Sequence, residues 1–416
     1  MEEQFALNCG ASREQVPLVG LRPDFRGAVN GKVNICMVAH DSRLYGAPSF
    51  LLDLACGLNR EAFQPILVFP QPLSQELRER AIQHHVPLFG VRKGVETSDP
   101  KPILAVKRLL NRFQLLRSYL RLFRQSRAQL VYLNTIRSTT AALAARLLGI
   151  PTLWCIHEMA ETLDLAGGPL RLRILRSLAC PIVTVTEAAR QDLIRRGVPS
   201  ERVRVIYNGF PIPDPTVVQQ SMDRRKAFPR RRISFVGYLS ASKDPLTLIR
   251  AFHRLADPDL DLWLFGDVVE GDDDYLSVLQ DEVRKLALEG RTRFFGRVPD
   301  MQAHYPSITI NVLPSRMESF GRTLGEAMSW GIPVVASRVG GIPELVTDGQ
   351  DGLLFQPGDV EGLAGHLRTL LNDPALYDRM SQSALRSMRE RFSINRSIHE
   401  HEQAMQEAIT RQTKAR

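Results

Sequence analysis

Residues 314–355 read PSRMESFGRTLGEAMSWGIPVVASRVGGIPELVTDGQDGLLF, and this stretch decides the fold of the 416-residue chain. It directly follows the apolar run ITINVL (308–313), and it contains two more such runs, PVVA (333–336) and GLLF (352–355). The segments between the runs carry apolar residues at three- and four-residue spacing, which is typical of helices. Short apolar strands that alternate with helices indicate a parallel sheet covered on both faces.

The same alternation extends outward in both directions. The remaining strand candidates are VNICMVA (33–39), PILVF (65–69), LVYL (130–133), TLWCI (152–156), PIVTV (181–185), VRVI (203–206), ISFV (233–236), LDLWLF (260–265) and TRFF (292–295). Residues 211–232 interrupt the pattern with four prolines, six basic residues and little apolar content, which favours a linker. The pattern therefore predicts an α/β protein with two Rossmann-like, doubly wound domains. We expect an extension (1–30), an N-terminal domain (31–212), a linker (213–232), a C-terminal domain (233–388) and a last helical segment (389–416).

Two glutamates in the opening stretch have spacing that suits a nucleotide-sugar. Glu318 lies in the loop after the strand, and Glu326 lies inside a helix that we expect to begin near Phe320 to Thr323. Ser319, Phe320 and Gly321 would place unpaired backbone N–H groups at that helix N-terminus, where phosphate binds well. Glu326 would then face a ribose diol, and Glu318 would face a sugar hydroxyl beyond the phosphates.

The stretch resembles the signature of the retaining glycosyltransferases of family 4, which have the GT-B fold. The matching motifs, in order, are E-S-F-G, the second Glu, A-M-x-x-G-x-P-V-V-A, G-G-I-P-E and D-G-x-x-G-L-L-F. The resemblance implies two domains that face each other across a cleft, with the acceptor on the first and the nucleotide-sugar on the second. It also implies sugar transfer with retention, in which the leaving phosphate takes the acceptor proton. The last segment is expected to pack back on the N-terminal domain.

A second match lies at SFVGYLSASKDPLTLIRAF (234–252), which is similar to the family's G-R-L-x-x-x-K-G segment. The resemblance assigns Gly237 to the donor site and Lys243 to the donor diphosphate and to catalysis. The glycine that follows the lysine in the family is replaced by Asp244, which is a good residue to cap the next helix.

The family's arginine in this segment is replaced by Tyr238, which donates one hydrogen bond but carries no charge. Arg322, in the first turn after E-S-F-G, is one candidate for the missing cation at the donor site. The alternative is that Arg322 is an exposed arginine on a helix.

Three more donor-site positions come from the resemblance. Gly46 matches the glycine-rich loop after the first strand, although the usual Gly pair is reduced to Tyr45-Gly46. His157, after TLWCI, matches a histidine near the donor sugar, and we count it as catalytic with Glu318 and Lys243. Arg297 and Val298 match a loop that meets the nucleobase through its backbone.

Other chemistries find less support. No G-x-G-x-x-G or G-x-x-x-x-G-K-[ST] motif follows the first strand, so dehydrogenases and P-loop enzymes lack their signatures. The run Asp272, Asp273, Asp274 is better explained as a solvated loop or helix start than as a metal site. We therefore expect no metal and no cofactor beyond the nucleotide-sugar. Two alternatives remain: a nucleotide-sugar-binding or scaffold protein of this fold with weak turnover, and a GT-B-shaped epimerase.

The net charge of +9 belongs to the first half of the chain. Residues 1–210 carry 28 basic and 17 acidic side chains, and no acidic residue lies between Pro100 and His157. Apolar residues at helical spacing in 101–127 have basic neighbours; they are Val106, Leu109, Leu110, Phe113, Leu116 and Leu120, beside Lys107, Arg108, Arg112, Arg117, Arg121, Arg124 and Arg127. Such a helix can lie on an anionic membrane. Alternatively, the apolar stripe packs on the domain's own sheet. We expect a glycan or lipid-linked acceptor and no nucleic acid.

The remaining features favour a cytoplasmic protein, peripheral at the inner face of the membrane if the basic segment binds lipid. The five scattered cysteines contain no C-x-x-C, the N-terminus does not resemble a secretory signal, and no uncharged stretch reaches 18 residues.

Overall fold

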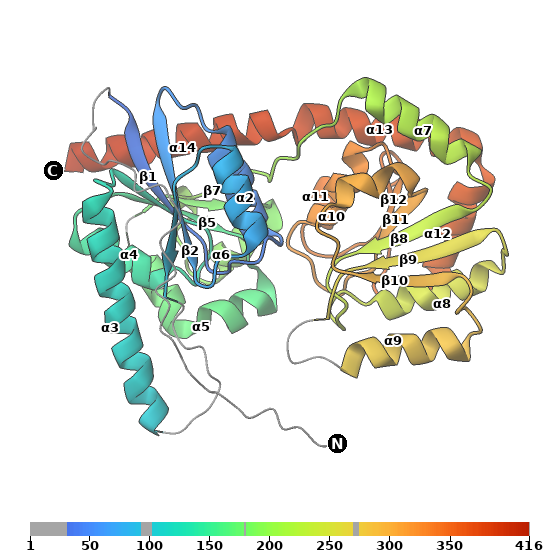
Figure 1. Ribbon diagram of the computed structural model, residues 1–416, viewed down its shortest axis with the longest axis horizontal. Helices are drawn as coiled ribbons and strands as arrows, with labels where there is room; N and C mark the ends of the chain where they lie inside the picture. Colours follow the sequence, from blue (N-terminus) through green and yellow to red (C-terminus); the bar gives the residue numbers. More distant parts are fainter. Residues whose placement is uncertain (1–30, 93–101, 179, 269–273, 416) are drawn as a thin grey trace, which may run out of the picture.

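The computed structural model describes residues 31–92, 102–178, 180–268 and 274–415, which form two α/β domains joined by helical segments (Figure 1). Three expectations fall outside these residues: the extension 1–30, the aspartates 272 and 273, and the side chains of residues 101–109. The α/β GT-B class expected from the sequence is confirmed by two parallel sheets, each with helices around it.

The N-terminal domain is built on a seven-stranded parallel sheet in the order β3-β2-β1-β4-β5-β6-β7. The register pairs Val33 with Phe63 and Ile35 with Leu130, so β1 lies between β2 and β4. The strands are β1 (Val33–Val38), β2 (Phe63–Pro70), β3 (Leu88–Val91), β4 (Leu130–Leu133), β5 (Thr152–Ile156), β6 (Ile182–Thr184) and β7 (Val203–Val205). The helices are α1 (Ala47–Gly57), α2 (Gln75–Gln83), α3 (Pro102–Gln125), α4 (Thr139–Leu147), α5 (Ala160–Ser177) and α6 (Glu187–Arg195).

The C-terminal domain has a six-stranded parallel sheet in the order β10-β9-β8-β11-β12-β13. Its strands are β8 (Arg231–Val236), β9 (Leu260–Phe265), β10 (Thr292–Gly296), β11 (Ile310–Leu313), β12 (Val334–Ser337) and β13 (Leu353–Phe355). Its helices are α8 (Pro245–Leu255), α9 (Asp274–Lys285), α10 (Arg322–Ser329), α11 (Ile342–Leu345), α12 (Val360–Asn372) and α13 (Pro374–Arg391). Fully buried strand residues such as Ile233, Leu262 and Val312 make the core of this domain, as their continuous apolar runs predict.

The chain passes between the domains twice, and the two passages lie side by side. Phe210 donates its N–H to the carbonyl of Phe392 (2.9 Å) and accepts the N–H of Ile394 (2.9 Å). The expected linker 213–232 contains a helix, α7 (Pro215–Ala227), which was not expected because residues 211–232 carry four prolines. Arg225 of α7 is 3% exposed and donates to the carbonyls of Trp330 and Gly331, which fixes this helix on the C-terminal domain.

The last helix, α14 (Ile394–Ala415), runs back over the N-terminal domain (Figure 1). The Tyr132 hydroxyl lies 3.3 Å from Nδ1 of the fully buried His401, and Asn59 donates its N–H to Glu402 at 2.7 Å. Arg204 at β7 forms an ion pair with Glu407 (3.1 Å). Strand and helix ends of the first domain are thus covered by the end of the chain.

No helix in the described part of the chain has both the length and the apolar content that crossing a bilayer requires. The four described cysteines, Cys36, Cys56, Cys155 and Cys180, are free thiols.

Candidate active site

The loop between β11 and α10 is held by close backbone contacts. Gly341 donates its N–H to the Glu318 carbonyl (3.1 Å), and a Cβ on Gly340 or Gly341 would lie 1.9 Å or 2.1 Å from the carbonyl oxygens of Glu318 and Ser319. Only glycine allows this approach. The G-G pair of the G-G-I-P-E motif therefore fixes the position of the E-S-F-G loop.

The fifth residue of that motif, Glu344, reaches the other domain. Its carboxylate accepts the backbone N–H groups of Glu187 (2.6 Å) and Ala188 (2.7 Å) at the N-terminus of α6, and the hydroxyl of Tyr207 (3.1 Å). Thr186 donates its hydroxyl to the Ser319 carbonyl (3.1 Å) from the same helix end. A helix N-terminus favours a carboxylate, so this contact joins the domains beside the loop.

Lys243 and Glu318 form an ion pair on one wall of the cleft. Lys243 comes from the loop between β8 and α8, and Glu318 also accepts the N–H of Ser319 at 3.1 Å. Asp244 caps α8 by accepting from the N–H and hydroxyl of Thr247, which confirms the capping role expected for it. The lysine and the glutamate, 75 residues apart, are therefore brought together by the loops that follow β8 and β11.

Glu326 lies on α10 and both of its oxygens accept protein hydrogen bonds. Arg322 donates Nε to Oε1 (3.0 Å), and the Tyr305 hydroxyl donates to Oε2 (3.0 Å). Phe320 is 3% exposed and its ring stacks with Phe210 in the core (centroids 5.9 Å apart), so any part it plays in ligand binding is through its backbone. Gly321, in the left-handed region at φ 86°, immediately precedes the helix.

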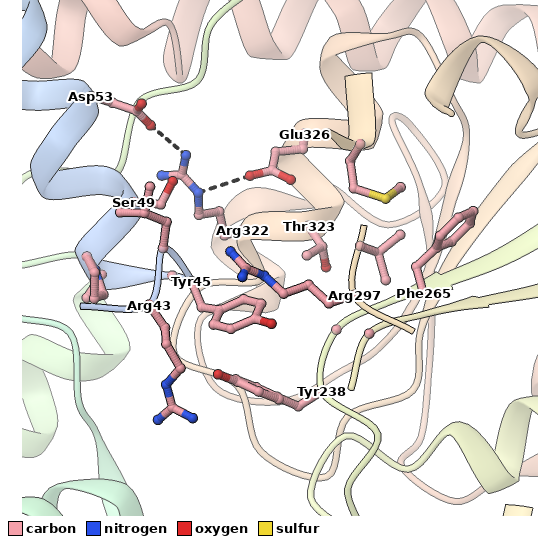
Figure 2. A pocket seen from close by; sticks show the side chains of 18 of the residues that line it. Arg43, Tyr45, Ser49, Asp53, Tyr238, Phe265, Arg297, Arg322, Thr323 and Glu326 are labelled. Atoms are coloured by element: carbon pink, nitrogen blue, oxygen red, sulfur yellow. Dashed lines mark hydrogen bonds and ion pairs between the residues drawn. The ribbon is translucent and has the colours of Figure 1, made fainter. Parts of the chain in front are cut away.

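Tyr238 lies where the family resemblance expects arginine, and it meets a tyrosine from the other domain. Its ring packs on that of Tyr45 (centroids 4.7 Å apart), and the Arg297 guanidinium lies 5.0 Å from the Tyr45 ring (Figure 2). Burial raises the pKa of Tyr238 to about 12, so it is a neutral donor at physiological pH. Gly46, next to Tyr45, has φ 47° and ψ −113°, a conformation that L side chains rarely adopt.

His157 follows β5 on the N-terminal domain. Its Nε2 lies 3.0 Å from Oδ1 of the buried Asn134, whose Nδ2 donates to the Ala47 carbonyl at α1 (2.8 Å). Because the Asn134 amide is oriented by Ala47, its oxygen faces the histidine and Nε2 carries the proton. Burial, with His40 and Arg322, lowers the His157 pKa to about 3, so the ring is neutral and its Nδ1 is an acceptor.

Glu158 lies beside His157 and accepts the N–H groups of His157 (3.2 Å) and Ile136 (3.4 Å) through one oxygen. Burial raises its pKa to about 7, against the backbone donors and Arg137, which lower it.

Most of the expected site residues line one cavity of about 1790 Å³ between the domains, whereas Phe320 and Gly321 are not part of its lining. The lining includes Gly46, His157, Glu158, Gly237, Tyr238, Lys243, Arg297, Val298, Glu318, Ser319, Arg322 and Glu326. Arg297 also donates to Glu76 of α2, and Arg322 to Asp53 of α1, so both arginines cross the cleft. Within the described residues, no three His, Cys, Asp or Glu side chains gather as metal ligands would.

Known families match each domain in turn. The family described as Glycosyltransferase Family 4 matches residues 45–212, and the one described as Glycosyl transferases group 1 matches residues 220–387. The chain belongs to the family 4 type of glycosyltransferases. The resemblance drawn from residues 314–355 is thereby confirmed for both domains.

Similar sequences and structures agree with this family. N-acetyl-alpha-D-glucosaminyl L-malate synthase of Bacillus anthracis is 33% identical over 156 residues, which are 37% of this chain and 40% of that protein. D-inositol 3-phosphate glycosyltransferase of Thermobifida fusca is 30% identical over 263 residues, 58% of this chain and 61% of that protein. The chain thus matches less than two thirds of the length of these relatives.

Among solved structures, Anabaena HepE in complex with UDP and glucose has a TM-score of 0.74 at 24% identity, covering 89% of this chain and 99% of HepE. Sucrose-phosphate synthase of Thermosynechococcus elongatus also has a TM-score of 0.74, at 18% identity, covering 91% of this chain and 100% of that protein. At these identities the likeness shows the fold.

Three residues that hold site residues in place or join the domains of this family 4 chain were not identified from sequence. Asn134 follows β4, and its place at a strand end was an available signal. Asp53 gave none, because it is one acid on an otherwise apolar helix and its partner Arg322 is 269 residues away. Glu344 was noticed only as part of a motif, and its contact with α6 needed the structure.

Proposed function

We propose that this family 4 chain transfers a sugar from a nucleotide-sugar to an acceptor hydroxyl, with retention at the anomeric carbon. The observation that carries the proposal is the meeting of Lys243, Glu318 and Glu326 from one domain with His157 from the other in a single cavity. The family match supports the reaction class. Because the chain matches less than two thirds of the length of its relatives, the donor and the acceptor must be identified by experiment.

The donor diphosphate is assigned to Lys243 and to the backbone N–H groups of Phe320 and Gly321, since the Ser319 N–H is bonded to Glu318. A cation and preorganised N–H dipoles stabilise the charge that grows on a leaving diphosphate. These groups supply positive charge without a metal, so we propose a metal-independent reaction. Gly237 and Gly46 line the same region of the cavity, one from each domain.

The transferred sugar is assigned to Glu318 and His157, which face it from opposite domains. Neutral His157 offers Nδ1 to a sugar hydroxyl, since Nε2 is held by Asn134. Glu318 is fixed by Lys243 and the Ser319 N–H, so it accepts from the sugar without a change of position.

The rest of the donor, its ribose and base, is assigned to α10 and to the loop after β10. Glu326 would accept from the ribose diol, and the backbone at Arg297 and Val298 would meet the base. Val298 lines the cavity, and Arg297 donates its N–H to Asp267 (2.9 Å), which fixes the backbone of this loop.

The proposed chemistry is a front-face displacement. The bond between the anomeric carbon and the phosphate oxygen breaks, the acceptor oxygen bonds to the same face of that carbon, and the acceptor proton passes to the leaving phosphate. Closure of the domains excludes water and limits hydrolysis of the donor.

The test is release of nucleoside diphosphate from a panel of UDP-, GDP- and ADP-sugars, with and without candidate acceptors. UDP-glucose comes first, because the similar HepE was solved with it. Lys243→Ala and Glu318→Ala are each expected to lower turnover by ~10²–10³-fold, the usual cost of one transition-state group. The matched controls are Lys226→Ala and Glu361→Ala, whose exposed ion pairs lie away from the cleft.

Two other outcomes would replace the proposal. Tight donor binding without turnover would favour the sugar-nucleotide-binding or scaffold alternative, for which the uncharged Tyr238 is the motivating observation. Conversion of one UDP-sugar into its epimer would favour an epimerase.

We also propose that the acceptor is a glycan or lipid-linked molecule at an anionic membrane surface, on the cytoplasmic side. The stripe on α3 is divided in the structure. Leu116 and Leu120 are partly buried against the domain's own core, whereas Leu110 and Phe113 are each 55% exposed. Arg117, Arg121 and Arg124 are exposed along the same helix. Its exposed surface therefore combines apolar and basic side chains, as membrane-surface helices do.

Vesicle flotation tests this part. Binding to phosphatidylglycerol-containing vesicles is expected, with none to phosphatidylcholine alone. Replacing Arg117, Arg121 and Arg124 by Gln should abolish it, whereas the exposed triple control Arg379, Arg386 and Arg389 to Gln on α13 should not. If the protein binds neither vesicle type at low salt, the membrane proposal is wrong.

A further inference from the structure

Asp53 on α1 of the N-terminal domain binds two arginines, one from each domain. Its carboxylate accepts from Arg80 of α2 (2.8 Å) and from Arg322 of α10 (2.7 Å), and its side chain is only 9% exposed. A carboxylate this buried is favourable only when it is paired and hydrogen-bonded. Asp53 therefore holds the guanidinium of Arg322 at a defined place on the far side of the cleft.

Arg322 transmits this contact to Glu326. The same guanidinium that bonds Asp53 through one terminal nitrogen donates Nε to Oε1 of Glu326 (3.0 Å), as the dashed lines in Figure 2 show. Arg322 is 14% exposed. Although burial acts to lower the pKa of Arg322, its neighbours Asp53 and Glu326 raise it, so it remains a cation. The four charges alternate in sign from Arg80 through Asp53 and Arg322 to Glu326.

The hydrogen-bond capacity of Glu326 explains why this orientation matters. An ionised carboxylate has about four lone-pair sites. The Arg322 Nε–H uses one on Oε1 and the Tyr305 hydroxyl uses one on Oε2, which leaves one site on each oxygen. One site on each oxygen is the arrangement that a cis-diol needs for two hydrogen bonds.

Without Asp53, Arg322 would be a buried cation with one partner. Its preferred contact with Glu326 would then be the two-pronged one, in which two N–H groups bond both carboxylate oxygens. With the Tyr305 hydroxyl still bound, that contact would leave only one of the two sites that a diol needs.

We propose that Asp53 is a positioning residue for donor recognition: by holding Arg322 it keeps Glu326 open to the ribose diol. This rests on the proposed function, which assigns Glu326 to the ribose. It follows that the nucleotide site of the C-terminal domain is complete only when α1 of the other domain is in contact with it. Arg322 thus acts on the ribose side of the donor. Its position depends on Asp53, which belongs to none of the family motifs.

The test compares dissociation constants of UDP and 2′-deoxy-UDP, measured by calorimetry; ADP and GDP with their 2′-deoxy forms are used if UDP does not bind. Wild-type protein is expected to bind the ribonucleotide about 10-fold more tightly, as one hydrogen bond to a charged group predicts. Asp53→Asn should reduce this preference to ~2-fold or less. Asp53→Glu should recover part of it.

The matched control is Asp192→Asn. Asp192 is also 9% exposed and also binds two arginines, Arg195 and Arg196, but it lies on α6 outside the cavity lining. It should leave the 2′-hydroxyl preference unchanged. Asp53→Ser, which removes the carboxylate but keeps a small polar side chain, gives a second route to the same loss if Asp53→Asn does not fold.

The outcomes separate this inference from the proposed function. A full 2′-hydroxyl preference in folded Asp53→Asn or Asp53→Ser overturns the positioning role and leaves sugar transfer intact. No preference in the wild type also overturns it. If the 2′-hydroxyl preference disappears in the variants and the wild-type protein transfers no sugar, the positioning role is supported and the proposed transferase activity is wrong.

Discussion

The carboxylate of Glu344 is predicted to hold the two domains together, and Glu344→Gln tests it. Glutamine keeps the shape but has no charge and one acceptor oxygen, whereas Glu344 serves two backbone N–H groups at 2.6 and 2.7 Å and a hydroxyl at 3.1 Å. A charged hydrogen bond contributes about 1.5–3 kcal/mol net, and the helix end adds ~0.3–1 kcal/mol. Because glutamine retains part of this, the closed arrangement should lose about 2–3 kcal/mol, or ~30–150-fold in the closed-to-open ratio.

The measurement is a distance distribution between the domains by pulsed electron paramagnetic resonance. Spin labels at Ile82→Cys on α2 and Val278→Cys on α9 use exposed positions, in a background with Cys9 and Cys56 changed to serine. The variant should show a broader and longer distribution than the wild type, with a lower kcat/KM for the donor. Glu361→Gln on the same domain is the control. Identical distributions for Glu344→Gln and wild type would refute the reasoning.

Three further changes test packing and buried charge. Phe320→Ala should destabilise the protein by about 3–5 kcal/mol, since a large aromatic core residue is removed, whereas the exposed control Val278→Ala should have little effect in urea unfolding. The raised pKa of Glu158, about 7 in the folded protein, means that stability is lost as pH rises from its unfolded value to 7. Between pH 4.5 and 8, Glu158→Gln should therefore gain about 3 kcal/mol relative to wild type, and a constant difference would contradict this. Burial lowers the pKa of His401 to about 3, so its stabilising effect is present above pH 6.5 and lost on acidification; His401→Gln should reduce the acid sensitivity by about 2 kcal/mol between pH 6.5 and 5.

The strands were predictable because each buried parallel strand is a continuous apolar run. All the strand candidates correspond to strands of the structure, and β3 was missed because LFGV contains a glycine and only its last residue is fully buried. The helix α7 was missed because its prolines lie at its start and beyond its end, where helices tolerate them.

The site was predictable where it lies at strand ends and in short motifs. Glu318, Glu326, Lys243 and His157 reach one cavity for that reason. The partners of Arg322 were not predictable. From sequence alone, an arginine on the first turn of a helix is expected to be exposed. Arg322 is buried only because α1 of the other domain packs against it.

The course of α14 has a consequence for how the protein is made. The helix packs on α1, β4 and β5, and His401 lies against Tyr132 and Phe50, residues that leave the ribosome hundreds of residues earlier. The first domain to be synthesised is therefore the last to be completed. Until the final helix emerges, the nascent first domain carries an uncovered apolar surface, while the second domain has all of its strands and can fold first.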